Sequence, residues 1–295
     1  RFDRAAREGG GGAQHRQTFF DRAHPRLRQM LGRTPAAEPG VVRGIEDQRR
    51  APRGIDDDLG AAADAAVRHA GVYPDASLFL ASGRVVHEAG GSAAQELAFA
   101  ASSAVAHVKA AVEARMSDEV ALRGTVVGLS VDAEYFDSLA KVRAMRLIWA
   151  NLSRAFGAET PADVEARSSR RMLAARDPWP NLLRLTAAGF AGAVGGADVV
   201  VLDGFTRAEG RPDAFARRQA RNTQLILQEE TGITHVVDPL AGSYYIESLT
   251  AELADKAWAI IEEVEAMGGM TKAVATGQPK LRIEETAARR QAMID

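Results

Sequence analysis

The chain has 295 residues, 46% of them hydrophobic, and its 37 basic and 39 acidic side chains leave a formal net charge of −2. This length fits one large α/β domain or two ordinary ones, and the near balance of charge argues against nucleic acid as a partner. The absence of cysteine excludes disulfide bridges and cysteine metal sites, which favours a cytoplasmic location. No apolar run approaches the ~20 residues that span a bilayer, so no membrane association is expected.

The first 58 residues differ in composition from everything that follows. Arginine, glycine and alanine dominate, residues 9–12 are four glycines, and within residues 1–53 twelve arginines accompany six acidic side chains. No apolar periodicity persists, so residues 1–58 are predicted to be a disordered Arg/Gly-rich extension. Polyanion binding is the functional alternative, but the arginines are scattered among acids without interleaved aromatic side chains.

The organised part of the chain alternates helical and β-branched patterns. Ser92 and Gln95 have the spacing of a capping box and mark the start of its second helix. Continuous apolar runs between helices of 15 to 20 residues predict a parallel sheet with βαβ crossovers, and hence an α/β fold. In chain order we expect helix 56–69, strand 77–82, loop 83–91, helix 92–115, strand 125–129, helix 134–156, strand 162–168, helix 180–194 and strand 198–202.

The segment after the fourth predicted strand is a helix followed by a turn. A helix is predicted over residues 215–231, and Gly232 ends it. The β-branched run at residues 233–237 then includes His235 as a strand member, before a turn that begins at Asp238. Three more helices are expected at 249–266, 270–276 and 282–294, the last with a solvated rather than a partner-binding surface.

Motifs of conventional catalysis are absent from the sequence. There is no phosphate-binding glycine loop followed by Lys-Ser or Lys-Thr, no Gly-x-Ser-x-Gly, and no histidine pair at metal spacing. His87 and Glu88 follow a predicted strand, where barrel enzymes place catalytic residues. A histidine beside a glutamate in a loop is more often a hydrogen-bonded surface pair, and His107 has the position of an ordinary helix member.

Several motifs in residues 72–295 resemble those of the methylmalonyl-CoA mutase family. That resemblance implies adenosylcobalamin-dependent isomerisation of methylmalonyl-CoA and succinyl-CoA on a (β/α)₈ TIM barrel, with a separate C-terminal corrinoid domain. Residues 59–266 would supply strands 5 to 8 of the barrel, and 267–295 a helical linker region. The motifs are His87-Glu88-Ala89-Gly90, Gln95-Glu96-Leu97-Ala98, Ala140-Lys141-Val142-Arg143-Ala144, Arg221-Asn222-Thr223-Gln224, Asp238-Pro239, Gly268-Gly269-Met270 and Pro279-Lys280-Leu281-Arg282.

The functional residues of the family are mostly replaced. Val85 stands where the family has its substrate-contacting histidine, so the resemblance implies no catalytic residue in this chain. Only Glu88 and Gly90 remain as cofactor-binding positions, and no metal ligand is expected because the cobalt-binding Asp-x-His-x-x-Gly is absent. Arg84 stands where the family has a tyrosine in the same substrate loop, and bulky arginines take the places of residues near the corrinoid: Arg167, Arg170 and Arg207.

The resemblance therefore points to the non-catalytic small subunit of a heterodimeric mutase, shortened at its N-terminus. Half a barrel has open sheet edges, so we expect a partner: either a large catalytic subunit, which would hold the cobalamin and the acyl-CoA, or a second copy. Two alternatives are a catalytic mutase half completed by a corrinoid-binding chain, and a truncated remnant without function.

Overall fold

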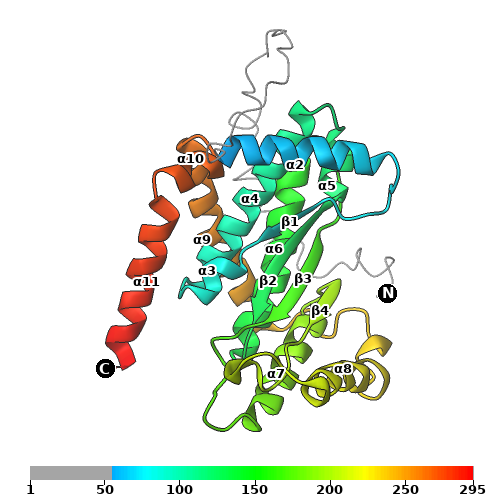
Figure 1. Cartoon of the computed structure of the whole chain (residues 1–295), viewed down its shortest axis with the longest axis vertical. Coiled ribbons are helices and arrows are strands. Elements are labelled where there is room, and N and C mark those ends of the chain that lie inside the picture. Colours follow the sequence, from blue (N-terminus) through cyan, green and yellow to red (C-terminus); the bar gives the residue numbers. More distant parts are fainter. Residues whose placement is uncertain (1–54, 295) are drawn as a thin grey trace.

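A computed structural model describes residues 55–294 of the chain (Figure 1). The predicted extension therefore lies outside the described residues as far as residue 54. Its last four residues, 55–58, form the first turn of helix α2 (Ile55–Ala70), whose three aspartates lie near the positive end of the helix dipole. Among residues 55–294, no helix has the length and apolarity needed to cross a membrane.

The described part of the chain is built on one parallel sheet of four strands in the order β1-β2-β3-β4. Every neighbouring pair is parallel, with Ala81 opposite Val127, and Ala166 opposite Val200. The predicted α/β class is confirmed, and the arrangement is that of a partial TIM barrel in which, among residues 55–294, no further strand pairs with β1 or β4. The strands are β1 (Phe79–Ser82), β2 (Thr125–Val131), β3 (Asp163–Ser168) and β4 (Val199–Val201).

The two faces of the sheet have different surroundings because side chains alternate along each strand. Ala81, Val127 and Val164 point toward the crossover helices and are at most 1% exposed. On the other face, Leu80 is 49% and Val199 is 50% exposed. The helices that cover the first face are α4 (Ala93–Glu113), α6 (Tyr135–Ala155) and α7 (Pro180–Val194).

Two helices from the C-terminal half pack on these helices (Figure 1). Helix α9 (Tyr244–Ala266) packs across α4 and α6, and α8 (Ala214–Glu229) packs beside α7. Trp258 of α9 joins Trp149 of α6 in the same buried cluster. Helices α10 (Met270–Ala275) and α11 (Gln278–Ile294) follow at the side of the molecule.

Several predicted boundaries are wrong, mostly at short elements. His235 lies in a 3-10 turn, η3 (Ile233–His235), and not in a strand. Two short helices fall where none was predicted, α3 (Arg84–Glu88) and α5 (Asp118–Arg123), and a further 3-10 turn, η2, spans Arg207–Glu209. Five or six residues are too few for a helical period to appear in the sequence.

Candidate functional site

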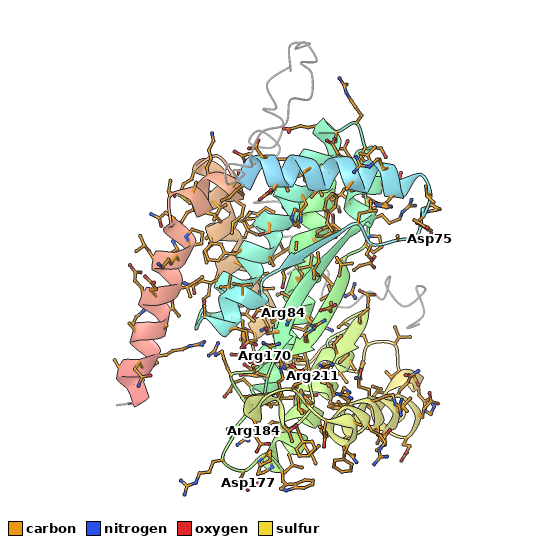
Figure 2. The ribbon with its side chains drawn as sticks, viewed as in Figure 1. Asp75, Arg84, Arg170, Asp177, Arg184 and Arg211 are labelled. Carbon is orange, nitrogen blue, oxygen red and sulfur yellow. The ribbon has the colours of Figure 1, made fainter. Side chains whose placement is uncertain are left out.

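The carboxyl ends of the four strands gather polar side chains at one edge of the sheet. Parallel strands bring the loops that follow them to the same edge, where α/β and barrel proteins hold their ligands. Figure 2 labels Arg84, Arg170 and Arg211 along this edge, from loops or turns that follow β1, β3 and β4. The edge holds two groups of residues, a buried carboxylate network and an arginine-rich rim.

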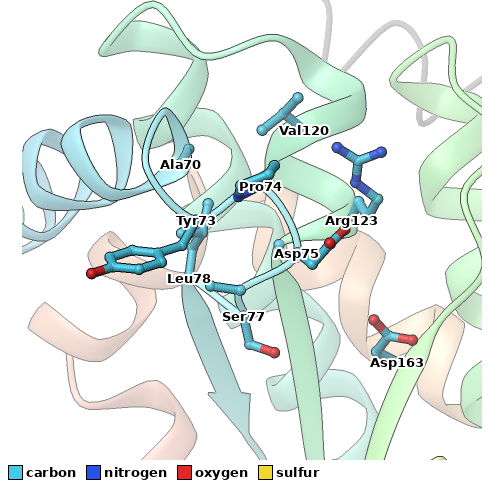
Figure 3. A pocket seen from close by; sticks show the side chains of 11 residues that line it. Ala70, Tyr73, Pro74, Asp75, Ser77, Leu78, Val120, Arg123 and Asp163 are labelled. Atoms are coloured by element: carbon cyan, nitrogen blue, oxygen red, sulfur yellow. The ribbon is translucent and has the colours of Figure 1, made fainter.

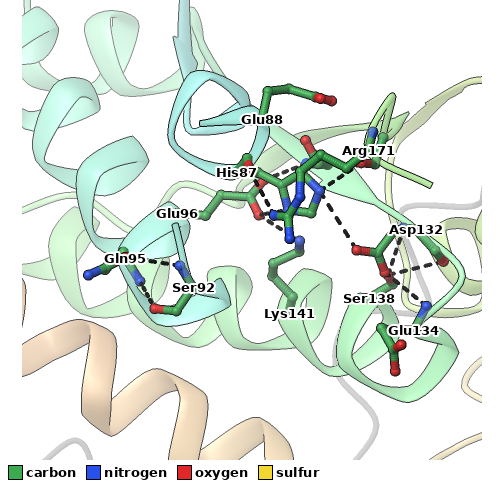
Figure 4. A network of polar contacts seen from close by, with 12 residues as sticks. His87, Glu88, Ser92, Gln95, Glu96, Asp132, Glu134, Ser138, Lys141 and Arg171 are labelled. Atoms are coloured by element: carbon green, nitrogen blue, oxygen red, sulfur yellow. Dashed lines mark hydrogen bonds and ion pairs between the residues drawn. The ribbon is translucent and has the colours of Figure 1, made fainter. Parts of the chain in front are cut away.

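Glu96 is the centre of the buried network and has no exposed surface. The capping box of Ser92 and Gln95 fixes the start of α4 and so places Glu96 in the first turn of that helix. One carboxylate oxygen accepts the Ser130 amide N–H at 2.5 Å, at the end of β2. The other accepts from Lys141 Nζ of α6 at 2.6 Å, so Glu96 links two helices to the sheet (Figure 4).

Two opposing effects act on the pKa of Glu96. Burial by itself raises the pKa, because it disfavours the charged carboxylate. The positive charge of Lys141 and the hydrogen bond from His87 outweigh burial, and the pKa of Glu96 is lowered from its ordinary value. Glu96 is therefore a carboxylate held in the ionised state inside the protein.

His87 connects this carboxylate to the loop after β3. Its Nδ1 lies 3.3 Å from Glu96 Oε2, and its Nε2 lies 2.8 Å from Ser169 Oγ and 3.7 Å from Asp132 Oδ2 (Figure 4). Serine, histidine and glutamate in this order resemble a nucleophile, base and orienting acid. Ser169 is 0% exposed, however, so no substrate can reach Oγ in this conformation. The three side chains therefore connect helices α3 and α4 to the loop after β3.

The structure corrects the expectation that His87 and Glu88 form a surface pair. His87 is only 4% exposed, and the two side chains have different partners. Glu88 accepts the Arg170 amide N–H at 2.9 Å. At Gly90, φ is +100°, and an added Cβ would lie 2.8 Å from the Cβ of Ala287 in α11. The cofactor-binding role of Glu88 and Gly90 stays a prediction, beside these structural roles.

The arginine-rich rim surrounds the network on its exposed side. Nη2 of Arg167 lies 3.2 Å from Oε1 of Glu165. The Nε atoms of Arg170 and Arg207 lie 3.6 and 3.9 Å from Oδ2 of Asp203, which both arginines share. Burial lowers the pKa of the Arg84 guanidinium, and the neighbouring charge of Arg167 also contributes. The guanidinium keeps its positive charge despite this lowering, since arginine stays protonated in proteins.

Val85 has no part in either group. Its side chain is 74% exposed, and it is apolar. The position that would carry the family's histidine thus holds a residue that can neither donate nor accept a proton.

Sequence reasoning missed Glu96 and Lys141 as site residues and placed them only as helix members. The feature of the sequence that could have identified Lys141 was a charged residue on an otherwise apolar helix face. Lys141 shares its face with Met145 and Ile148 at spacings of four and seven, and both neighbours are fully buried. Such a charge must find a partner inside the protein.

One cavity lies away from this edge, at the amino ends of the strands (Figure 3). It measures about 140 Å³ and has Tyr73, Asp75, Arg123 and Asp163 among its lining residues. The amino-terminal face of a barrel generally serves stability rather than chemistry. Within residues 55–294, no group of three or more histidine or carboxylate side chains is placed to hold a metal ion.

Comparisons with known proteins agree with the motifs. The family model described as "Methylmalonyl-CoA mutase" matches residues 62–295. A methylmalonyl-CoA mutase of Cereibacter sphaeroides is 48% identical over 72% of this chain and 31% of its own length. The small subunit from Streptomyces virginiae is 39% identical over 74% of this chain and 36% of its own, and the large subunit from Porphyromonas gingivalis is 39% identical over 72% and 30%. The chain thus spans about a third of the length of these relatives.

Proposed function

The chain belongs to the methylmalonyl-CoA mutase family, and we propose that it acts there as a small, non-catalytic subunit. Its role is to dock against a large catalytic subunit that interconverts methylmalonyl-CoA and succinyl-CoA. Residues 59–266 form the barrel part and residues 267–295 the linker part of this subunit, and its location is cytoplasmic. Relatives named as large and as small subunits support the existence of such a pair.

The observation that carries this proposal is that the polar side chains at the strand-end edge are already paired with one another. An isomerase that handles radical intermediates needs an enclosed pocket shaped around substrate and cofactor. Here the rim arginines are paired with Glu165 and Asp203, and Val85 offers no proton donor. The buried histidine, His87, is fully engaged with Glu96 and Ser169.

Adenosylcobalamin does not fit the residues at this edge. Glu88, the one charged residue carried over from the corrinoid lining, already accepts a backbone N–H. Arg170 and Arg207 place charged, bulky groups around Asp203. We therefore assign the cobalamin and the acyl-CoA to the partner subunit.

A mixing experiment tests the proposal. The purified chain is combined with the large mutase subunit of its own organism, and size by light scattering, corrinoid absorbance and turnover are measured. We expect a heterodimer in which turnover requires the large subunit and survives Glu88→Gln in this chain. Stoichiometric cobalamin binding by this chain alone would contradict the non-catalytic role. Loss of turnover in the intact Glu88→Gln heterodimer would contradict it as well.

A second function is favoured by one observation. Two proteins named methylmalonyl-CoA mutase are 48% and 45% identical to the chain, while two others of that name are 40% and 37% identical and two named small subunits are 39% and 41% identical. The identities of 48% and 45% support a catalytic barrel half completed by a corrinoid-binding chain. Mutase turnover on mixing with a corrinoid-binding chain that is inactive by itself would support it and exclude the small-subunit role.

A further inference from the structure

A second cavity lies at the carboxyl end of β4, between the loop that leaves the strand and helix α8. Its volume is about 410 Å³, in the range of small-molecule sites. Residues of three kinds line it: an apolar floor, a glycine–proline turn, and a polar wall in which arginines predominate. They are Leu202, Asp203, Gly204, Arg211, Pro212, Arg217, Ala220, Arg221 and Gln224.

Close packing forms the floor of this cavity. A Cβ added to Gly204 would lie 2.6 Å from the Cβ of Pro212, so only glycine allows the turn to approach the strand end this closely. Leu202 and Ala220 are 7% exposed and supply the apolar base. Nη1 of Arg217 donates to the carbonyl oxygen of Pro212 at 2.5 Å, which holds the guanidinium at the cavity wall.

The wall carries positive charge without a matching negative charge. Within the described part of the chain, Arg211, Arg217 and Arg221 make no ion pair with a carboxylate. Asp203 is the one acidic residue in the lining, and Arg170 and Arg207 from the rim already share it.

The spacing along α8 adds to this imbalance. Arg217 and Arg221 are four residues apart and lie on one side of the helix, where like charges destabilise the helix slightly. Asp213 at the N-cap accepts the Ala216 amide N–H at 2.7 Å and makes no ion pair with either arginine within residues 55–294. A bound anion between the arginines would remove the repulsion.

We propose that this cavity binds a small phosphate-bearing anion. Guanidinium groups bind phosphate through paired, charge-assisted hydrogen bonds, and three of them around a concave site suit its several oxygens. The Gln224 amide supplies a further donor from the next turn of α8. The small-subunit role assigns no ligand to this chain, so the inference goes beyond it.

A folded acidic protein segment fits the site less well. Protein interfaces are broad surfaces, whereas these arginines line a cavity of about 410 Å³ that ends on buried Leu202 and Ala220. A phosphate group, free or carried by a small organic molecule, reaches that floor.

Calorimetric titration of the full chain at low salt tests the proposal, with inorganic phosphate and adenosine monophosphate as probes. We expect saturable one-to-one binding of both. Arg217→Gln and Arg221→Gln should each weaken binding about tenfold. Arg218→Gln is the matched control, since Arg218 carries the same charge on the same helix but lies over the Phe215 ring, 5.4 Å from its centroid. It should bind phosphate like the unchanged chain.

The two probes separate the possible ligands. Tighter binding of the nucleotide than of phosphate indicates a phosphate ester, and equal binding indicates phosphate itself. Equal loss in Arg217→Gln and Arg218→Gln would mean general attraction to a basic surface and overturn the site, as would the absence of saturable binding. The titration uses this chain alone, so its outcome is independent of whether a mutase partner exists.

Discussion

Glu96 and Lys141 form a buried ion pair whose partners lie on consecutive crossover helices. Lys141 is 3% exposed and Glu96 has no exposed surface, so neither charge is solvated by bulk water. The pair does not by itself imply high stability, because desolvation of two charges offsets much of their attraction. Loss of one partner is different, since the remaining charge stays buried and unpaired.

Lys141→Met should therefore destabilise the chain by about 3–5 kcal/mol at pH 7. The loss of unfolding free energy in this variant depends on pH, because the pKa of Glu96 is lowered in the folded protein. The ion pair therefore stabilises the fold above the ordinary glutamate pKa of about 4.3. Its contribution is lost as the pH falls through the lowered pKa of folded Glu96. Urea unfolding at pH 7 and at about pH 3, below the ordinary glutamate pKa, should show the difference from the unchanged chain narrowing in acid.

Lys256→Met is the control for this prediction. Lys256 pairs with Glu252 on the exposed side of α9, and side chains of both are more than half exposed. We expect a change below about 1 kcal/mol. Similar effects of the two substitutions would show that burial of the Glu96 pair does not matter.

Helix α11 is attached to the barrel part through specific contacts in its second and third turns. The Gln95 side-chain amide donates to the Arg282 carbonyl oxygen at 3.1 Å and to Thr286 Oγ1 at 3.0 Å. The next residue, Ala287, lies against Gly90. The sequence prediction of a solvated surface for this helix overlooked this side, because such contacts join residues about 190 positions apart.

Gly90→Ala tests how much the attachment of α11 depends on the close approach between Gly90 and Ala287. The added methyl group meets Ala287 at 2.8 Å and also occupies a backbone with φ of +100°. Gly157→Ala is the matched control, with φ of +80° and no atom within 4 Å of an added Cβ. The control should lose about 1–2 kcal/mol of unfolding free energy, the cost of a left-handed conformation.

The Gly90 variant should lose more than this and expose α11 to limited proteolysis. Equal losses in the two variants would indicate that α11 is held without this contact, and would leave Gly90 free for the predicted cofactor role.

At the scale of the whole described fold, residues 55–294, the sheet is open. One face is covered by helices, and the other exposes Leu80 and Val199 beside ion pairs such as Arg167 with Glu165. This face is therefore mixed rather than purely apolar. Open edges and partly apolar faces promote pairing with another chain.

We expect the isolated chain to associate as its concentration rises, as measured by sedimentation velocity. The double variant Leu80→Gln and Val199→Gln should shift this association to higher concentration. Val72→Gln with Leu183→Gln provides a control, because both residues are at least 66% exposed and neither belongs to a strand of the sheet. Association that responds only to the control pair would place the contact away from the sheet.

The order and type of the long elements followed from the sequence. The four strands and the helices α4, α6 and α7 were predicted within a few residues, because their apolar periods extend over several turns or a whole buried strand. The family was also recognisable from its motifs, and the match over residues 62–295 confirms it. Short helices such as α3 and α5 were not predictable, since one or two turns leave no period.

The chemistry of the strand-end edge was decided by the tertiary structure. That Val85 and the arginines replace the family's lining is a prediction from residue identity alone, and it stays a prediction. Only the fold brought Glu96, Lys141, His87 and Ser169 into one buried network, because their contacts span up to 82 positions along the chain. Burial then decided their role: charges that would be solvated on an open helix are held in fixed pairs inside the protein.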